Sequence, residues 1–484
     1  MTRILQNHDN VQWPILSVEG MKPHLMHESS RTRSRWFGLL IGVSLLIVML
    51  WLLSKSSGNG PTVGADRGET KTPDVTAEGK GVRSVRTSEA SRRSKLADSQ
   101  NLTADEVVAG KLRQFGANRR IIVYALADHF KYDVPDDVQR FFEAVEGGSW
   151  EEINAAHEAL LLSKDQLNQP RSPELHQIWR PIQETWGAAR EAHNWPGQKL
   201  LDYGQAVLGS LRPGMVYIGG TDPGCFIPTF LNETGEGEHH VVLTQNALAD
   251  GSYLDYLNFV YDNRLNTLGH DDSEGAFQDY IADAQKRFQH DQQFPDEPKQ
   301  VRAGEEIRVV DGKVQVGGQV AVMAINEALF QKLMDKNPDA SFAIEQSVAF
   351  TSIYSNAAPL GPLLELRVQD AEDALTAERA AQSVGYWSDV SRQLLSDAEA
   401  ANSSDVLMAY VKAASEQAAL FVDRHLTSEA GQTYKIAIQL ASNIPNASDY
   451  AKWLIPVVEN ALKITPENPQ YVDLLKRLQT VKKK

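Results

Sequence analysis

The sequence predicts a central α/β domain of Rossmann-like strand–loop–helix units, flanked by all-α segments and preceded by one transmembrane helix. Three observations support this fold class. Two short β-rich runs, Met215–Ile218 and His240–Gln245, are bounded by Gly, Pro and Asp in the way that buried strands are. Apolar residues recur at helical spacing on either side of this region, from Ala104 and again after Ala371. The segment Trp36–Leu53 is almost wholly apolar and carries no charge.

Length and composition limit the classes of protein that this chain can belong to. A chain of 484 residues is too long for one compact core, so two or three domains are expected. The net charge of −15 argues against nucleic acid as a partner, because phosphate binding needs a clustered positive surface. The single cysteine, Cys225, excludes an internal disulfide, and no Cys/His set has zinc-ligand spacing. We therefore expect no metal and no cofactor.

The amino-terminal part is expected to anchor the chain. Residues 1–35 are polar and irregular, and the apolar segment 36–53 is predicted to be a transmembrane helix, since about 20 apolar residues span ~30 Å of hydrocarbon. A signal peptide is the alternative, but a leader of 35 residues is long and no small-residue cleavage motif follows Leu53 directly. Arginines at positions 31, 33 and 35 favour a cytoplasmic amino terminus. The bulk of the chain would then lie outside the cytoplasm, at an inner or plasma membrane.

Residues 54–104 follow the predicted span and are rich in Ser, Gly, Thr and charge, which predicts a disordered linker. Four arginines lie between Lys80 and Lys95. This cluster could touch anionic lipid or a wall polymer, but a solvated linker is the interpretation that we favour.

Residues 105–200 are predicted to be helical. Gly147-Gly148 interrupts the apolar periodicity, so we expect an αα-hairpin there. Three tryptophans at helical positions, Trp179, Trp186 and Trp195, are expected to be core residues.

The predicted α/β domain covers residues 201–370. The alternating segment Ile307–Val316 is centred on Asp-Gly and predicts a β-hairpin. Further elements are predicted as a polar helix at Ser273–Gln293, an apolar helix at Ala321–Met334 and strands at Phe342–Glu345 and Leu363–Val368.

Residues 371–484 are predicted to be helical. Two apolar helices in this region, one around Ala437–Leu440 and one around Ala461–Ile464, contain small residues and are stopped by proline. That shape is typical of tetratricopeptide repeats, although the two copies are spaced more closely than in such repeats. A short tetratricopeptide-like array and an ordinary helical bundle both remain open.

Three segments together with this tail, Tyr217–Phe230, Val241–Leu257 and Ser341–Arg367, carry a resemblance. They resemble the soluble carboxyl-terminal part of a bacterial family of multi-spanning membrane proteins of unknown function. That family is distantly related to protein O-mannosyltransferases, and some members end in tetratricopeptide-like repeats. In such transferases the donor lipid and the catalytic acid sit in the spanning part, which this sequence does not match, so the resemblance implies no transferase activity.

A candidate ligand-binding rim follows from the predicted strands. Loops at the carboxyl ends of adjacent strands share one edge of a sheet, so Thr221, Asp222, Asn246 and Asp250 are expected there. Asp222 could bind a metal or sugar hydroxyls or act as a general base. The alternative, which we favour, is that Thr221–Gly224 is a β-turn in which the Asp222 side chain accepts hydrogen bonds from backbone N–H groups. Asp250 fits a helix N-cap. The glycine-rich loop is not a phosphate loop, because it lacks GxGxxG spacing and contains Pro223.

The function expected from the sequence is that of a membrane-anchored envelope adaptor, which contacts a protein partner through its helical surfaces. Whether the chain is an enzyme stays uncertain, and we lean against it, since no GxSxG, HExxH or paired-carboxylate signature appears and no catalytic residue can be named. The alternative is a protein that handles a glycan or nucleotide sugar at the rim around Asp222 and Asp250. A metal-dependent hydrolase at the same rim is the third hypothesis.

Overall fold

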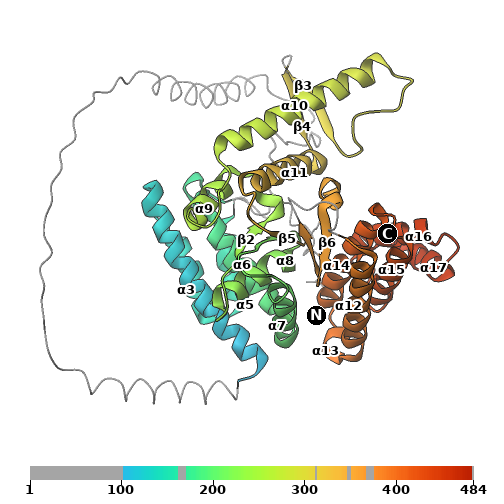
Figure 1. Ribbon diagram of the computed structural model, residues 1–484. Coiled ribbons are helices and arrows are strands. Elements are labelled where there is room, and N and C mark those ends of the chain that lie inside the picture. Colours follow the sequence, from blue (N-terminus) through green and yellow to red (C-terminus); the bar gives the residue numbers. More distant parts are fainter. Residues whose placement is uncertain (1–101, 162–169, 311–312, 346–349, 367–374, 482–484) are drawn as a thin grey trace, which may run out of the picture. The chain divides into compact units, whose positions relative to one another are not determined.

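The computed structural model describes residues 102–161, 170–310, 313–345, 350–366 and 375–481 (Figure 1). The predicted tail, span and most of the linker lie outside these residues. Within the described part, no helix combines the length and the apolar character that crossing a membrane requires. The described residues belong to one compact unit, which is mostly helical and contains a small mixed sheet.

The amino-terminal helices are α3 (Ala104–Phe130), α4 (Asp136–Gly147), α5 (Trp150–Leu160), α6 (Trp179–Asn194) and α7 (Gly197–Leu208). The predicted αα-hairpin is confirmed: α4 ends at Gly147, its C-cap residue Gly148 has a left-handed φ of 78°, and the side chain of Ser149 caps α5. Long α3 begins with a capping box between Thr103 and Glu106 and packs against α6, α7 and α8. Of the three tryptophans, Trp179 and Trp195 are buried and Trp186 is half-buried.

The main sheet has the strand order β2-β1-β5-β7-β6. Its strands are β1 (Val216–Gly219), β2 (Val241–Thr244), β5 (Phe342–Ile344), β6 (Ala357–Leu360) and β7 (Leu363–Leu366). Strand β1 pairs in parallel with β2 and β5. Helix α8 (Asp222–Thr234) provides the crossover that lets β1 and β2 run parallel. Strand β7 runs antiparallel to β5 and β6, and Gly361, at a φ of 57°, turns the chain between β6 and β7. Strand β6 was not predicted, since Pro359 breaks its pattern.

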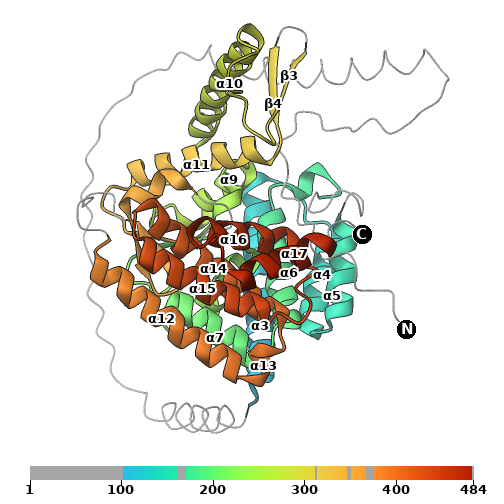
Figure 2. The same ribbon diagram turned by 90° about the vertical axis from the view of Figure 1, so that its right-hand side faces the viewer.

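An excursion separates β2 from β5. It consists of α9 (Gly251–Tyr261), α10 (His270–Gln293), β3 (Glu306–Val310), β4 (Lys313–Gly317) and α11 (Gln319–Lys336). The predicted hairpin and both predicted helices are confirmed. Helix α10 lies beside the hairpin in both views (Figures 1 and 2).

The carboxyl-terminal helices are α12 (Ala377–Ser396), α13 (Ala398–Ala401), α14 (Ser404–Asp423), α15 (Thr427–Ser442), α16 (Ala451–Ile464) and α17 (Pro469–Val481). Helices α14 and α15 form one closely packed pair and α16 and α17 another, while α12 packs on α15 (Figure 2). The two proline-stopped segments of the sequence are the ends of α15 and α16. They are thus the second helix of one pair and the first of the next, and a repeat remains a prediction.

These layers share one core. Helix α8 contacts β1 and β2, while α12 contacts β6 and α14 contacts β7. Most of the buried apolar side chains form one cluster that runs from α3 to α17, and Ala380, Phe421 and Ala430 form a small second cluster. The main sheet is therefore packed against the crossover helix α8 and against the carboxyl-terminal helices α12 and α14.

Candidate functional site at the carboxyl edge of the sheet

The carboxyl ends of β1 and β5 form a switch point of the sheet. The chain leaves β1 toward β2 on one side, whereas β5, which comes later in the sequence, pairs with β1 on the other side. Open α/β sheets bind ligands at such switch points. Here the loop Gly219–Thr221 leaves β1, and Glu345 directly follows β5.

The carboxylate of Glu345 fills this position. It accepts hydrogen bonds from the backbone N–H groups of Gly220 and Thr221, both at 2.9 Å, and from the Thr221 hydroxyl at 2.6 Å. The same hydroxyl accepts a hydrogen bond from the N–H of Gly224 at 3.0 Å and so caps α8. Glu345 is only 3% exposed. An internal carboxylate thus occupies the place at a helix N-terminus that suits an anion.

Two opposing effects act on the Glu345 carboxyl. Burial raises its pKa, whereas the hydrogen bonds from Thr221 and Gly220 and the charge of Lys412 lower it. Lys412 lies on α14, so this helix contributes to the electrostatics of the sheet edge. Gly224 leaves room for the carboxylate, because a Cβ atom there would lie 1.9 Å from Glu345 Oε2.

The β-turn interpretation of Asp222 is wrong, because Asp222 is the first residue of α8 and Thr221 is the N-cap of this helix. The side chain of Asp222 forms an ion pair. Its Oδ2 accepts a hydrogen bond from Arg190 of α6 at 2.8 Å, and Arg190 also bonds Glu191 Oε1 at 2.8 Å. Although burial opposes the charge, the carboxylates of Asp222 and Glu191 raise the pKa of Arg190. The guanidinium also lies over the rings of Trp186 and Phe226. The side chain of Asp222 is therefore engaged in a structural ion pair with Arg190.

The other two predicted rim residues have different roles. The side chain of Asn246 donates to the carbonyl oxygen of Gly220 at 3.2 Å, so it lies beside the Thr221 loop. Asp250 caps α9 through bonds from the N–H and hydroxyl of Ser252, which confirms the N-cap prediction. The structure thus brings Thr221 and Asn246 together at Gly220, while Asp222 turns to Arg190 and Asp250 to its own helix.

Several polar residues of this edge were not singled out from the sequence. Glu345 was predicted only as the end of a strand, and Arg190 only as part of a helical segment. Arg180, on the same helix as Arg190, is buried and bonds Thr244 at the end of β2 and Glu184. The sequence signal for these residues is a charged side chain at a strand end or among the apolar positions of a helix. This signal does not identify the partner of the charge, because the partner is distant in sequence.

Cys225 follows this loop and is buried. Burial raises the pKa of its thiol well above the ordinary value, which disfavours a reactive thiolate. Among the described residues, no group of three or more His, Cys, Asp or Glu side chains could hold a metal ion. Searches of family models, of curated proteins and of solved structures find no match to this chain.

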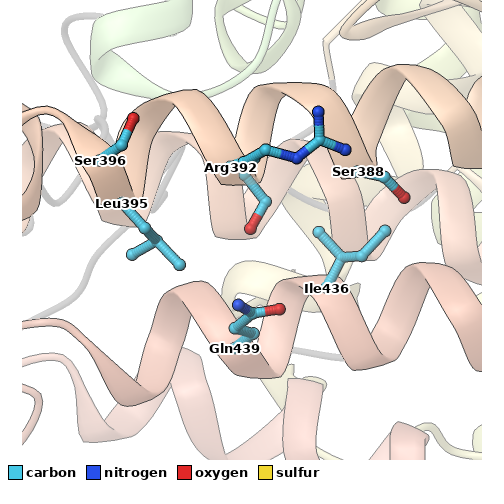
Figure 3. Close-up of a pocket in the computed structure, with 7 residues that line it drawn as sticks. Ser388, Arg392, Leu395, Ser396, Ile436 and Gln439 are labelled. Atoms are coloured by element: carbon cyan, nitrogen blue, oxygen red, sulfur yellow. The ribbon is translucent and has the colours of Figure 1, made fainter.

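A groove lies away from the sheet edge, between α12 and α15 (Figure 3). Its volume is about 420 Å³, within the usual range of ~300–1,000 Å³ for ligand sites. The side chains of Leu395, Ile436 and Gln439 face the gap between the two helices. The lining residues are Ser388, Ser391, Arg392, Leu395, Ser396, Ile436 and Gln439.

Proposed function

We propose that this chain is a non-enzymatic adaptor of a bacterial cell envelope, which binds a protein partner through the surface of α12–α17. One observation carries the proposal. The polar groups of the sheet edge that could serve chemistry, chiefly Glu345 and Asp222, are held by partners inside the chain. The α12–α15 groove instead has a buried hydroxyl, that of Ser391, without a partner among the described residues. A groove with unmet hydrogen-bonding capacity is better suited to a partner than an edge whose groups are satisfied.

The anchor and the location belong to the same proposal. The apolar segment Trp36–Leu53 would hold the chain in the inner or plasma membrane, with the described helices outside the cytoplasm. We also propose that the helices α12–α17 bind their partner in the way that tetratricopeptide repeats do, and that the chain is related to the bacterial multi-spanning family. The proposed relation to that family implies no enzymatic reaction.

The second candidate is a protein that binds a glycan or nucleotide sugar at the sheet edge. Its support is the position of the Thr221 loop at a switch point, beside the N-terminus of α8. A ligand phosphate or hydroxyl would have to displace the carboxylate of Glu345 from Gly220 and Thr221. The adaptor function does not require this displacement, because the hydrogen bonds of Glu345 stay in place, and we therefore favour it.

Site-specific photocrosslinking tests the adaptor. A benzoylphenylalanine replaces exposed Gln439 in the groove, and in a control chain it replaces Gln198, an exposed residue of α7. In native membranes we expect one discrete crosslinked species from position 439 and none from position 198. No species from position 439, or the same species from both positions, would refute the adaptor.

A further inference from the structure

We infer that the α12–α15 groove binds an extended peptide segment that carries a carboxylate next to an aliphatic side chain. This inference rests on the proposed adaptor function and specifies the chemistry of the partner. It depends on five lining residues, which offer four kinds of contact.

Ser391 supplies an unmet hydrogen-bonding group. It is 3% exposed and lines the groove, yet its hydroxyl has no partner within the described chain. The neighbouring hydroxyls are satisfied, because Ser388 donates to the carbonyl of Val384 and Ser396 to that of Gln393. Buried hydroxyls in proteins nearly always have a partner, so an occupant of the groove is the natural source of one here.

Gln439 lies on the opposite wall, on α15, and its side chain is exposed. In the part of the chain that the structure covers, its amide makes no side-chain hydrogen bond. A primary amide offers an acceptor and two donors, which match the N–H and C=O groups of an extended backbone. Gln439 can therefore bond a peptide backbone directly, while the Ser391 hydroxyl, which is covered in the free chain, must rotate toward the groove to bond it from the other wall.

Arg392 supplies the charge. Its nearest partner is Asp389 on the same helix at 3.1 Å, and the two side chains are 76% and 75% exposed. Exposed pairs of this kind contribute little, so the guanidinium can turn to a carboxylate of the partner at small cost. A guanidinium binds a carboxylate through two parallel hydrogen bonds, which favours an acidic partner over a neutral one.

Leu395 and Ile436 provide the apolar part, and both face the gap in Figure 3. Two aliphatic contacts suit one aliphatic side chain. A bound helix would need a continuous apolar groove for anchors at i, i+3 or i+4, and i+7. An extended segment, with its backbone bonded from both walls, fits this mixed lining better.

Fluorescence anisotropy with the full-length chain in detergent micelles tests the inference. The probe is fluorescein-labelled Ser-Leu-Asp-Leu-Asp-Ser, and the comparison probe carries Asn in place of both Asp residues. We expect saturable binding of the acidic probe and at least tenfold weaker binding of the Asn probe. Arg392→Gln should weaken binding of the acidic probe by a similar factor.

The chain offers a matched control for Arg392. Arg477 lines a second groove of about 280 Å³, pairs with Asp473 on its own helix at 3.2 Å and is 64% exposed. Arg477→Gln should leave binding unchanged. Ser391→Ala should weaken binding without lowering the melting temperature, because the hydroxyl that it removes has no partner in the free chain. A lower melting temperature would instead indicate a structural role for that hydroxyl.

Three outcomes would overturn the inference: no saturation with the acidic probe, equal binding of the two probes, or equal effects of Arg392→Gln and Arg477→Gln. If the crosslink from position 439 persists in any of these cases, the adaptor stands and only the chemistry of its partner is wrong. If the crosslink is also absent, the adaptor itself fails.

Discussion

Glu345 and Thr221 are 124 residues apart in the sequence, yet the Glu345 carboxylate accepts hydrogen bonds from both the backbone N–H and the hydroxyl of Thr221. This contact joins the end of β5 to the start of α8 at the switch point of the sheet. A charged group that bonds two backbone donors can be removed only by leaving those donors unsatisfied. The relationship therefore makes Glu345 a residue on which the central fold depends.

Removal of this carboxylate should destabilise the protein strongly. We expect Glu345→Ala to lower the free energy of unfolding by roughly 2–5 kcal/mol, because the N–H groups of Gly220 and Thr221 lose a buried charged acceptor. Urea denaturation measures the change. Glu146→Ala is the control, since Glu146 is 58% exposed and 3.9 Å from its nearest cation, and it should change stability by less than ~0.5 kcal/mol. Equal effects of the two substitutions would contradict the role of Glu345.

Gly224 should be energetically coupled to Glu345. A Cβ atom at position 224 would lie 1.9 Å from Glu345 Oε2, so Gly224→Ala should cost about 1–3 kcal/mol in the wild-type chain. In a Glu345→Ala background that clash is gone and the cost should fall. A double-mutant cycle by urea denaturation measures this coupling, and we expect at least ~1 kcal/mol. Additive costs would show that the close approach is relieved in another way.

The stability of the protein should depend on pH through Glu416 of α14. Burial raises the pKa of its carboxyl to about 7, and the negative charge of Glu345 adds to this, while a hydrogen bond from Tyr354 at 3.0 Å opposes it. A raised folded-state pKa means that the stabilisation is complete below the unfolded pKa and is lost as pH rises through about 7. Relative to Glu416→Gln, the wild type should lose roughly 1–3 kcal/mol between pH ~5 and ~8.

Urea denaturation of both proteins across this pH range provides the measurement. Tyr354→Phe removes the hydrogen bond that lowers the pKa, so it should move the midpoint of the loss to higher pH. If wild type and Glu416→Gln have parallel pH profiles, Glu416 does not titrate in this range.

Asp222→Ala should act on stability and leave ligand response unaffected. The substitution leaves buried Arg190 with Glu191 as its remaining carboxylate partner, so we expect a loss of about 1–3 kcal/mol. Thermal-shift measurements compare this variant with wild type in the presence of divalent metals, nucleotide sugars and simple glycans. The adaptor predicts no shift in either protein. A ligand at ~100 times its dissociation constant would add ~2.7 kcal/mol. Such a shift in wild type that is absent in the variant would favour the sugar-handling alternative.

Local features of the chain could be predicted because neighbouring residues encode them. The hairpin at Ile307–Val316 follows from alternation around Asp-Gly, and the cap at Asp250 follows from its position before an apolar helix. The parallel strands β1 and β2 follow from two buried runs with a crossover between them. Strand β6 could not be found in this way, because among the described strands it pairs with β7 alone, and Pro359 hides its pattern.

The candidate site shows the same division. The sequence could place Thr221, Asp222, Asn246 and Asp250 near strand ends, since this depends only on where each strand stops. It could not assign Asp222 to Arg190, 32 residues earlier on another helix. The groove was equally hidden, since α12 and α15 are separated by α13 and α14.

By itself, the sequence determined most of the helices and strands and the cap at Asp250, because hydrogen bonds within a few residues and apolar periodicity decide them. Only the tertiary structure decided which polar groups are satisfied and which remain open to a partner. That outcome depends on the order of strands in the sheet and on the helices packed against its carboxyl edge. Which polar groups meet across more than a hundred residues of sequence is decided by the packing of the whole chain. Glu345 finds hydrogen-bond donors in this way, whereas the hydroxyl of Ser391 has no partner among the described residues.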